Sequence, residues 1–215
     1  MTEHRLTVPR SARYFSLGKP VREVWFVLHG YGQLAATFLA EFAALDDGAR
    51  LVVAPEALSR YYVDHRNRKV GASWMTREDR LVEIEDYVRY LDAVYADVFR
   101  AVDRASVSAH VVGFSQGAAT GSRWVAMGAA RLDRLMLWGG EVPPDLPLER
   151  PNERDRLARS RLTLVLGSRD EFITDKVVAR DTERLAAAGV PHRVVRYDGG
   201  HGIDERVLRQ LTAEA

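Results

Sequence analysis

The chain has 215 residues and a formal net charge of +1, with 47% hydrophobic and 28% charged residues. This balance is typical of a globular protein, and it supplies no bulk charge for binding nucleic acid or an anionic membrane. No stretch reaches the roughly 18 apolar residues of a membrane span, and the lack of cysteine excludes disulfides, thiolate catalysis and zinc–sulfur sites.

The chain is expected to form a single domain that comprises residues 1–215, because its length is that of a medium-sized unit with a substantial core. The first fifteen residues carry no apolar segment of the length that a signal peptide needs. We therefore expect a soluble, cytoplasmic protein without a membrane span.

Short apolar runs alternate along the chain with longer amphipathic segments, which indicates an α/β fold. The expected strands are Val21–Gly30, Arg50–Glu56, Ser108–Ser115, Leu132–Gly140, Arg161–Ser168 and His192–Gly200. Most of these runs are continuously apolar, as in a parallel sheet covered by helices on both faces. Helical spacing predicts helices over Leu81–Val102, Gln116–Met127, Asp175–Ala188 and Asp204–Leu211.

Three further segments fit neither pattern clearly. Residues 5–18 are predicted to form a polar antiparallel hairpin at the sheet edge. Residues 61–79 form a polar stretch with aromatic residues, and residues 141–160 form a proline-rich connection. We expect both to be loops, and loops of this length in a compact domain are usually functional or mobile.

The segment Gly113-Phe114-Ser115-Gln116-Gly117 has the form G-x-S-x-G. Chance supplies this pattern in roughly one chain in twenty at the average glycine frequency, so its setting decides its meaning. A buried strand precedes Ser115 and a helix of small residues follows. This is the setting of a nucleophile elbow, in which a serine sits on a strained turn with small neighbours.

A serine hydroxyl becomes a good nucleophile only when a base accepts its proton. Only His192 and His201 follow Ser115 in the sequence. His192 begins a predicted strand, whereas His201 lies in the glycine-rich loop "YDGGHGID" before the last helix. We therefore expect His201 to be the catalytic base.

The acid that orients the histidine is expected after a strand between Ser115 and His201. Asp170 fits, because it follows the strongly apolar strand "LTLVLG". Its rivals are less suitable: Asp175 is placed as a helix N-cap, and Asp198 and Asp204 are too near His201 in sequence to lie on a separate loop.

The negative oxygen of a tetrahedral intermediate needs hydrogen-bond donors. One is expected to be the backbone N–H of Gln116, directly after the serine, and the other the N–H of Tyr31 in "HGYG" after the strand "VWFVLHG". A phosphate-binding loop is disfavoured because the segment lacks the GK[ST] ending. His29 is expected to orient the loop or pack, and His110 to lie in the core.

The segments "LHGYGQ", "GFSQG", "SRD" and "GGHGI" occur in this order over nearly the whole chain. In this the sequence resembles the serine α/β-hydrolases, and more narrowly the carboxylesterase/phospholipase family that includes the acyl-protein thioesterases. The resemblance implies an α/β-hydrolase fold without a large cap domain, a catalytic triad of Ser115, Asp170 and His201, and oxyanion donors at Tyr31 and Gln116.

The sequence departs from that family in two loops. It has Trp74-Met75-Thr76 where the family often has W-F-D, and "GGEVPPDLP" where a small Ser-Gly pair is more usual. Both loops are expected to border the acyl pocket. Two interpretations stay open for the residues Tyr61, Tyr62, Trp74 and Met75: walls of the substrate pocket, or ordinary packing under a long loop.

The function expected from these observations is hydrolysis of small carboxylic esters or thioesters through an acyl-enzyme, with no metal and no organic cofactor. The alternatives are a lysophospholipase or acyl-protein thioesterase, and a hydrolase-fold binding protein with little catalysis. The expected partner is the small-molecule substrate, not nucleic acid, and the sequence leaves a homodimer open.

Overall fold

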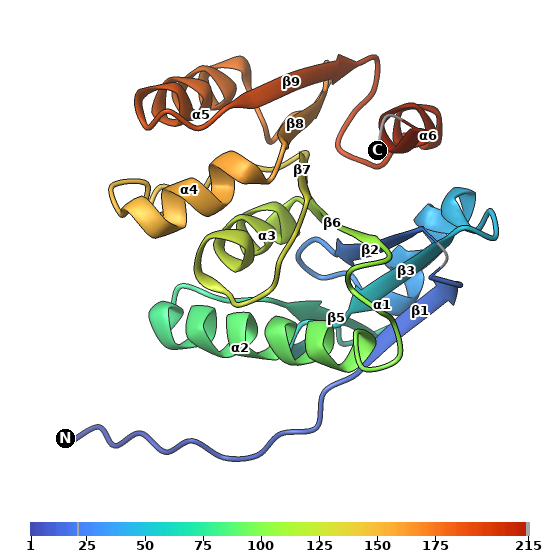
Figure 1. Cartoon of the computed structure of the whole chain (residues 1–215). Helices are drawn as coiled ribbons and strands as arrows, with labels where there is room; N and C mark the ends of the chain where they lie inside the picture. The colour runs from blue at the N-terminus through green and yellow to red at the C-terminus, as the bar shows by residue number, and fades with distance from the viewer. Residues whose placement is uncertain (21, 214–215) are drawn as a thin grey trace.

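A seven-stranded sheet lies at the centre of the computed structural model, which describes residues 1–20 and 22–213. Val21, at the start of a predicted strand, and residues 214–215 lie outside the described residues. The strand order is β1-β3-β2-β6-β7-β8-β9 (Figure 1). The strands are β1 (Tyr14–Gly18), β2 (Glu23–Leu28), β3 (Arg50–Pro55), β6 (Ser108–Phe114), β7 (Arg134–Trp138), β8 (Leu162–Gly167) and β9 (His192–Tyr197). Among the described strands of this sheet, only β1 runs antiparallel to its neighbour.

Helices cover both faces of this sheet, as the continuous apolar runs predicted. One face carries α2 (Arg80–Val98), α3 (Gln116–Met127), α4 (Pro151–Arg159) and α5 (Asp175–Ala187). The other carries α1 (Ala35–Leu39), the 3₁₀ helix η1 (Ala40–Leu45) and α6 (Glu205–Ala213). Among the described helices, none is both long and apolar enough to cross a membrane.

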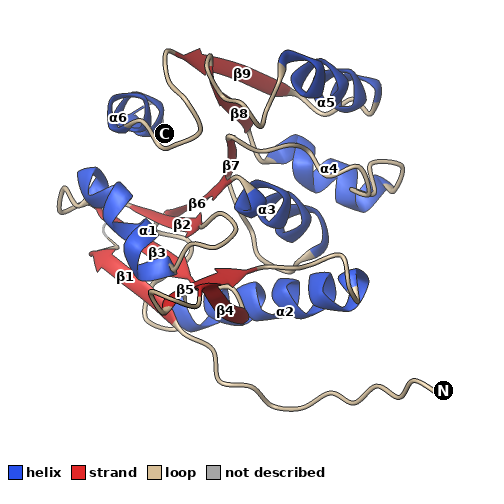
Figure 2. Cartoon of the chain, turned by 180° about the vertical axis from the view of Figure 1, so that it is seen from behind, coloured by secondary structure: helices blue, strands red, loops and turns tan. Residues whose placement is uncertain are grey.

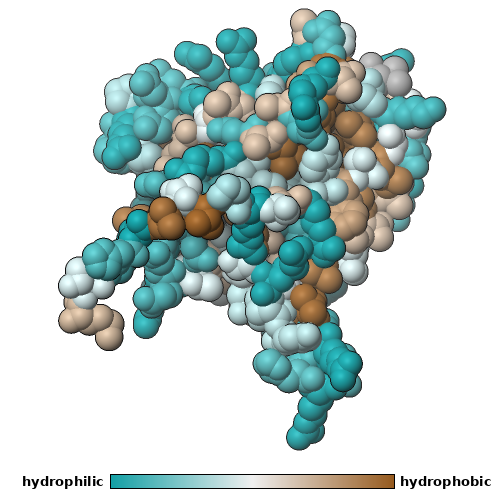
Figure 3. All heavy atoms as spheres, turned by 90° about the horizontal axis from the view of Figure 1, so that it is seen from below, coloured by the Kyte–Doolittle hydropathy of each residue, from teal (hydrophilic) through white to brown (hydrophobic). Residues whose placement is uncertain are grey.

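The strand β2 shows how the sequence divides the core into two layers. Val24, Phe26 and Leu28 pack with the α2–α5 layer, whereas Trp25 and Val27 pack with the layer of α1 and α6. Alternate side chains of a strand point to opposite faces, so a strand buried on both sides must be apolar throughout. The outer surface of the molecule differs from this buried strand. The helix α2 lies at the bottom of Figure 1, and the surface seen from below is mostly hydrophilic (Figure 3).

Three segments differ from their predictions. Residues 5–18 do not form a hairpin: β1 alone pairs with β3, and the residues before it form an extended segment (Figures 1 and 2) in which Arg5 bonds to Asp79 and Arg10 to the carbonyl of Leu58. Residues 61–79 are not a loop, because β4 (Ser59–Asp64) and β5 (Lys69–Ser73) form an antiparallel hairpin. The proline-rich connection ends in α4, which has Pro151 at its first position, where its missing N–H costs no hydrogen bond.

The polar composition of residues 61–79 concealed this hairpin. Its two strands make a separate two-stranded sheet beside α2 (Figure 2), and their outer face is solvated, so they have no long apolar run. A register irregularity between Tyr62 and Asp64 further weakens the pattern. The hairpin also supplies an edge to which the loop after β2 bonds, since Gly32 donates to the carbonyl of Ala72 at 2.9 Å.

The turn between β6 and α3 depends on glycines at which two backbones touch. A Cβ atom at Gly113 would lie 2.2 Å from the carbonyl oxygen of Gly117, and one at Gly117 would lie 2.1 Å from that of Leu28. No side chain fits at such distances. The glycines of the G-x-S-x-G segment therefore allow α3 to start directly against β2 and β6.

We expect Gly117→Ala to lower the free energy of unfolding by about 2–3 kcal/mol, the usual cost of forcing extra atoms into packed structure. Urea denaturation monitored by tryptophan fluorescence would measure the change. Gly202→Ala is the matched control, because a Cβ there has no heavy atom within 4 Å. Equal stability of the two variants would contradict the close-packing argument.

Candidate active site

Ser115 lies on the turn between β6 and α3 with an unusual backbone conformation. Its φ is 53° and its ψ is −117°, a region that costs a non-glycine residue of order 1–3 kcal/mol. Its N–H donates to the carbonyl of Trp138 in β7 at 2.9 Å, and its carbonyl accepts from Ala118 at 3.0 Å. The strained turn is thus held from both sides and directs the serine into a cavity.

His201 and Asp170 come from the loops after β9 and β8, which are neighbours in the sheet. The Nδ1 atom of His201 lies 2.8 Å from Oδ2 of Asp170. The other carboxylate oxygen accepts the N–H groups of Phe172 at 2.8 Å and Ile173 at 3.0 Å, and the Asp170 side chain is fully buried. A carboxylate in this position accepts a hydrogen bond from Nδ1, so Nε2 is left free to accept a proton.

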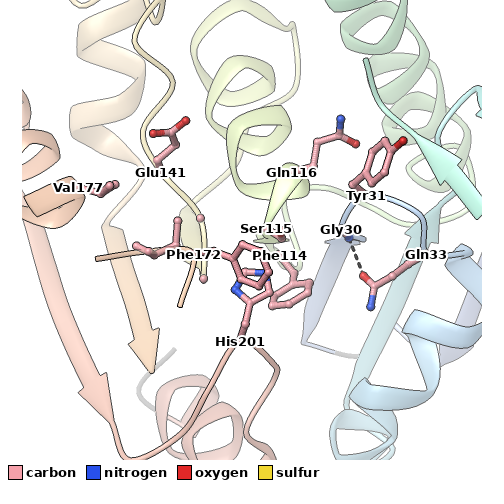
Figure 4. A pocket seen from close by; sticks show the side chains of 13 residues that line it. Gly30, Tyr31, Gln33, Phe114, Ser115, Gln116, Glu141, Phe172, Val177 and His201 are labelled. Atoms are coloured by element: carbon pink, nitrogen blue, oxygen red, sulfur yellow. Dashed lines mark hydrogen bonds between the residues drawn. The ribbon is translucent and has the colours of Figure 1, made fainter. Parts of the chain in front are cut away.

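A cavity of about 630 Å³ contains both Ser115 and His201. Figure 4 shows the two residues close together at its centre, with Tyr31 and Gln33 on one side and Val177 and Glu141 on the other. The complete lining consists of Gly30, Tyr31, Gln33, Phe114, Ser115, Gln116, Gly139, Gly140, Glu141, Phe172, Ile173, Val177 and His201.

Two aromatic rings hold the imidazole of His201. The ring of Phe114 lies 4.8 Å and that of Phe172 lies 4.7 Å from the imidazole, measured between centroids. Gly139, with φ of +53°, packs against the imidazole and its carboxylate partner, since a Cβ there would lie 3.2 Å from Nδ1 of His201 and 3.3 Å from Oδ2 of Asp170. The histidine therefore has little freedom to turn away from its carboxylate partner.

The loop after β2 brings Tyr31 to the opposite side of Ser115. A Cβ at Gly30 would lie 3.2 Å from Cβ of Ser115, so this loop packs closely against the serine. The side chain of Gln33 accepts the N–H of Gly30 at 2.7 Å (Figure 4). Tyr31 and Gln116 both line the cavity.

None of the four tentative pocket residues, Tyr61, Tyr62, Trp74 and Met75, is in the lining of this cavity, and their role as pocket walls stays a prediction. Trp74 is buried and its indole donates to the carbonyl of His29 at 2.8 Å. Met75 packs against the core, and Tyr62 is exposed on the hairpin. Tyr61 lies behind the lining, with its ring centroid 5.4 Å from that of Tyr31. The second open interpretation, ordinary packing, holds for Trp74 and Met75.

Phe172, Ile173 and Val177 form an apolar wall that the sequence analysis did not identify. They follow Asp170 and continue into α5. The signal was present in "RDEFIT", where two apolar residues, Phe172 and Ile173, stand two and three positions after the predicted acid in a polar segment. Phe172 is 71% exposed and lies at the cavity beside the imidazole of His201.

The other histidines have structural surroundings. His29 is buried, with Nδ1 2.8 Å from the carbonyl of Gly30 and Nε2 accepting the N–H of Ala57 at 3.1 Å. Burial lowers the pKa of His29, and burial also lowers the pKa of His110 to about 4, so both are neutral near pH 7. His110 lies in the core, as predicted, with its ring centroid 4.4 Å from that of Trp25 and the two rings tilted by 40°.

The rival aspartates also have other partners. Asp175 is not the N-cap of α5, which is Thr174; it pairs with Arg196 at 2.7 Å. Asp198 pairs with Arg169, and Asp204 accepts the N–H of Val207 at 2.9 Å at the start of α6. In the described part of the chain, no group of three or more His, Asp or Glu side chains is arranged to hold a metal ion.

A strained serine at the carboxyl end of a parallel strand, facing a histidine–carboxylate pair, is the arrangement of the α/β-hydrolase class. The model of the family described as serine hydrolase (FSH1) matches residues 24–206. The chain belongs to this family of serine hydrolases, which confirms the class that the sequence motifs predicted.

Solved structures agree with the fold. Acyl-protein thioesterase 2 of Zea mays superposes with a TM-score of 0.72 at 19% identity, covering 94% of this chain and 99% of that one. A carboxylesterase from Mesorhizobium loti gives 0.73 at 21%, covering 95% of each chain. Esterase PE8 gives 0.70 at 23%, covering 95% and 98%. No curated protein sequence matches the chain significantly.

We expect Asp170→Asn to lower kcat by about 10³–10⁴-fold, because the amide cannot hold His201 in the tautomer that leaves Nε2 free. Steady-state hydrolysis of a p-nitrophenyl ester would measure this loss. Asp198→Asn is the matched control, since that aspartate pairs with Arg169 on the surface. Similar activity of the two variants would rule out the role of Asp170.

Proposed function

We propose that this serine hydrolase cleaves carboxylic esters or thioesters of small acyl groups through an acyl-enzyme on Ser115. The observation that carries the proposal is the placement of Ser115, on its strained turn, in one cavity with His201, whose Nδ1 atom is 2.8 Å from Asp170. The likeness to the structures of a thioesterase, a carboxylesterase and an esterase supports this bond type.

In the first half of the reaction, Oγ of Ser115 attacks the carbonyl carbon while Nε2 of His201 accepts its proton. The resulting oxyanion accepts the N–H groups of Tyr31 and Gln116. The bond to the leaving oxygen or sulfur then breaks, and His201 returns the proton to that atom. The buried negative charge of Asp170 stabilises the imidazolium that exists in between.

In the second half, a water molecule takes the place of the alcohol or thiol. His201 accepts a proton from the water as its oxygen attacks the acyl carbon, and then gives a proton back to Oγ of Ser115. The carboxylic acid leaves and the resting state returns. The residues of this chain supply every proton transfer, so the cycle is written without a metal or an organic cofactor.

The acyl group is proposed to lie along the wall formed by Phe172, Ile173 and Val177, the apolar part of the cavity. Acyl-protein thioesterase activity is a second candidate, favoured by the likeness to the enzyme of Zea mays. A cytoplasmic location is also proposed, and the absence of cysteine supports it, since structural disulfides are typical of oxidising compartments.

We expect Ser115→Ala to abolish turnover of p-nitrophenyl butyrate and of its thioester analogue, and to abolish labelling by a fluorophosphonate. Loss of both readouts is expected because the label forms a bond to the same oxygen that attacks the ester. Ser122→Ala is the matched control, since Ser122 lies on the same helix and bonds only to the carbonyl of Ala118. Ligand binding by a wild-type protein that neither turns over nor labels would instead support the binding-protein alternative.

We expect Val177→Trp to lower kcat/KM for the octanoate ester by about tenfold or more while leaving that for the acetate within about twofold. A larger side chain fills the apolar wall, and a methylene that no longer fits costs about 1–3 kcal/mol. A series of p-nitrophenyl esters of increasing chain length would show the shift. Val194→Trp, on the exposed side of β9, is the control, and an unchanged length profile for Val177→Trp would place the acyl group elsewhere.

A further inference from the structure

The side chain of Gln116 makes contacts that its expected role does not require. Catalysis as proposed above uses only its backbone N–H. Its side-chain amide nevertheless bonds to Trp74 and Met75, which follow β5 and come from a different part of the chain. We propose that Gln116 is a positioning residue: its side chain fixes the backbone donor of the serine turn relative to the donor of the Tyr31 loop. The proposal rests on the ester hydrolysis proposed above.

The bonds of the Gln116 side chain engage both ends of the amide. Its Oε1 atom accepts the N–H of Trp74 at 3.0 Å, and its Nε2 atom donates to the carbonyl of Met75 at 2.8 Å. Nε2 also lies 3.2 Å from Oγ of Ser73, a buried hydroxyl that itself donates to Met75 at 2.8 Å. An amide bound at both ends cannot rotate or slide without losing at least two hydrogen bonds.

The same short segment is bonded on its other side to the loop that carries Tyr31. The N–H of Ala72 donates to the carbonyl of Gln33 at 3.1 Å, and the carbonyl of Ala72 accepts from Gly32 at 2.9 Å. The indole of Trp74 donates to the carbonyl of His29 at 2.8 Å. Residues 72–75 therefore form a bridge, with the Tyr31 loop attached on one side and Gln116 on the other.

This bridge sets the position of the Tyr31 N–H relative to the Gln116 N–H, on which stabilisation of the oxyanion depends. Tyr31 and Gln116 must each place an N–H about 2.7–3.1 Å from one developing oxyanion. The turn that carries Ser115 and Gln116 is bonded to β7, whereas the Tyr31 loop follows β2. Within the sheet, the two N–H donors are therefore positioned by different strands. A misplacement of about 1 Å can cost about a hundredfold in rate. The bonds through Gln116 complete the connection between the two donors.

The test uses Gln116→Met, which keeps the size of the side chain but cannot form its hydrogen bonds, and Gln116→Glu, which keeps only the acceptor for Trp74. We expect kcat for p-nitrophenyl butyrate to fall by about 10–100-fold in both, with KM within about twofold, because the donors act on the transition state. The inhibition constant of a trifluoromethyl ketone, which forms a tetrahedral adduct with the serine, should weaken by a similar factor.

Two further variants separate positioning from a general loss of stability. Ser122→Ala removes a buried hydrogen bond elsewhere on α3, and its kcat should stay at the wild-type value. Trp74→Phe removes the bond to His29 on the far side of the bridge, so it should lower kcat and ketone affinity as the Gln116 variants do. If the Gln116 variants fail to fold, Trp74→Phe tests the proposal in their place.

A wild-type kcat in folded Gln116→Met, or in Trp74→Phe if that variant must replace it, would overturn the proposal. An equal loss in Ser122→Ala would do the same, since it would show a nonspecific effect of α3. These failures leave the proposed function intact, because the wild-type protein would still turn over esters and Ser115 would still be labelled. A wild-type protein without esterase activity would instead remove the proposed function.

Discussion

The close approach of three backbone segments around Ser115 is the constraint on which the site depends. A Cβ at Gly117 would meet the carbonyl of Leu28 in β2, and one at Gly140 would lie 2.3 Å from Cβ of Ala118 and 2.7 Å from the carbonyl of Ser115. The serine is thus enclosed by β2, β6, β7 and α3. Packed backbone is nearly incompressible, so it can hold a conformation that the serine would not adopt alone.

The parallel sheet brings the other residues of the site close to this serine turn. Because the carboxyl ends of parallel strands meet at one edge, the loops after β2, β6, β8 and β9 converge there. Each loop brings one component: Tyr31, Ser115, Asp170 and His201. These residues are far apart in sequence but need no long connection in space, and the β4–β5 hairpin adds support from outside the sheet.

The sequence predicted the parts whose signals are local. Six apolar runs correspond to six strands of the sheet, and the G-x-S-x-G segment marked the turn, because continuous hydrophobicity and glycine have one dominant physical meaning there. The position of Asp170 followed from the same logic, as an acidic residue in the loop after a buried strand.

The pocket walls could not be predicted in this way. Tyr61, Tyr62, Trp74 and Met75 were chosen because aromatic and apolar residues stood in a polar stretch, but which way they face depends on the hairpin and on what it packs against. The side chain of Trp74 points inward, where its indole N–H donates to the carbonyl of His29. Phe172 reached the cavity because Asp170 accepts its N–H and that of Ile173, which folds the segment back over His201. The contacts of Trp74 with His29 and of Phe172 with His201 join distant parts of the chain, and they leave no periodic pattern.

The order of the strands also decides how the protein loses its activity. The loop of His201 follows β9, which ends the sheet and pairs only with β8 among the described strands. Terminal strands exchange their amide hydrogens and open more readily than central ones. The serine, between β6 and α3, belongs to the most protected region, whereas the histidine belongs to a unit that can detach first. Mild denaturation should therefore separate the two residues while most of the sheet is still folded, and inactivation should precede unfolding.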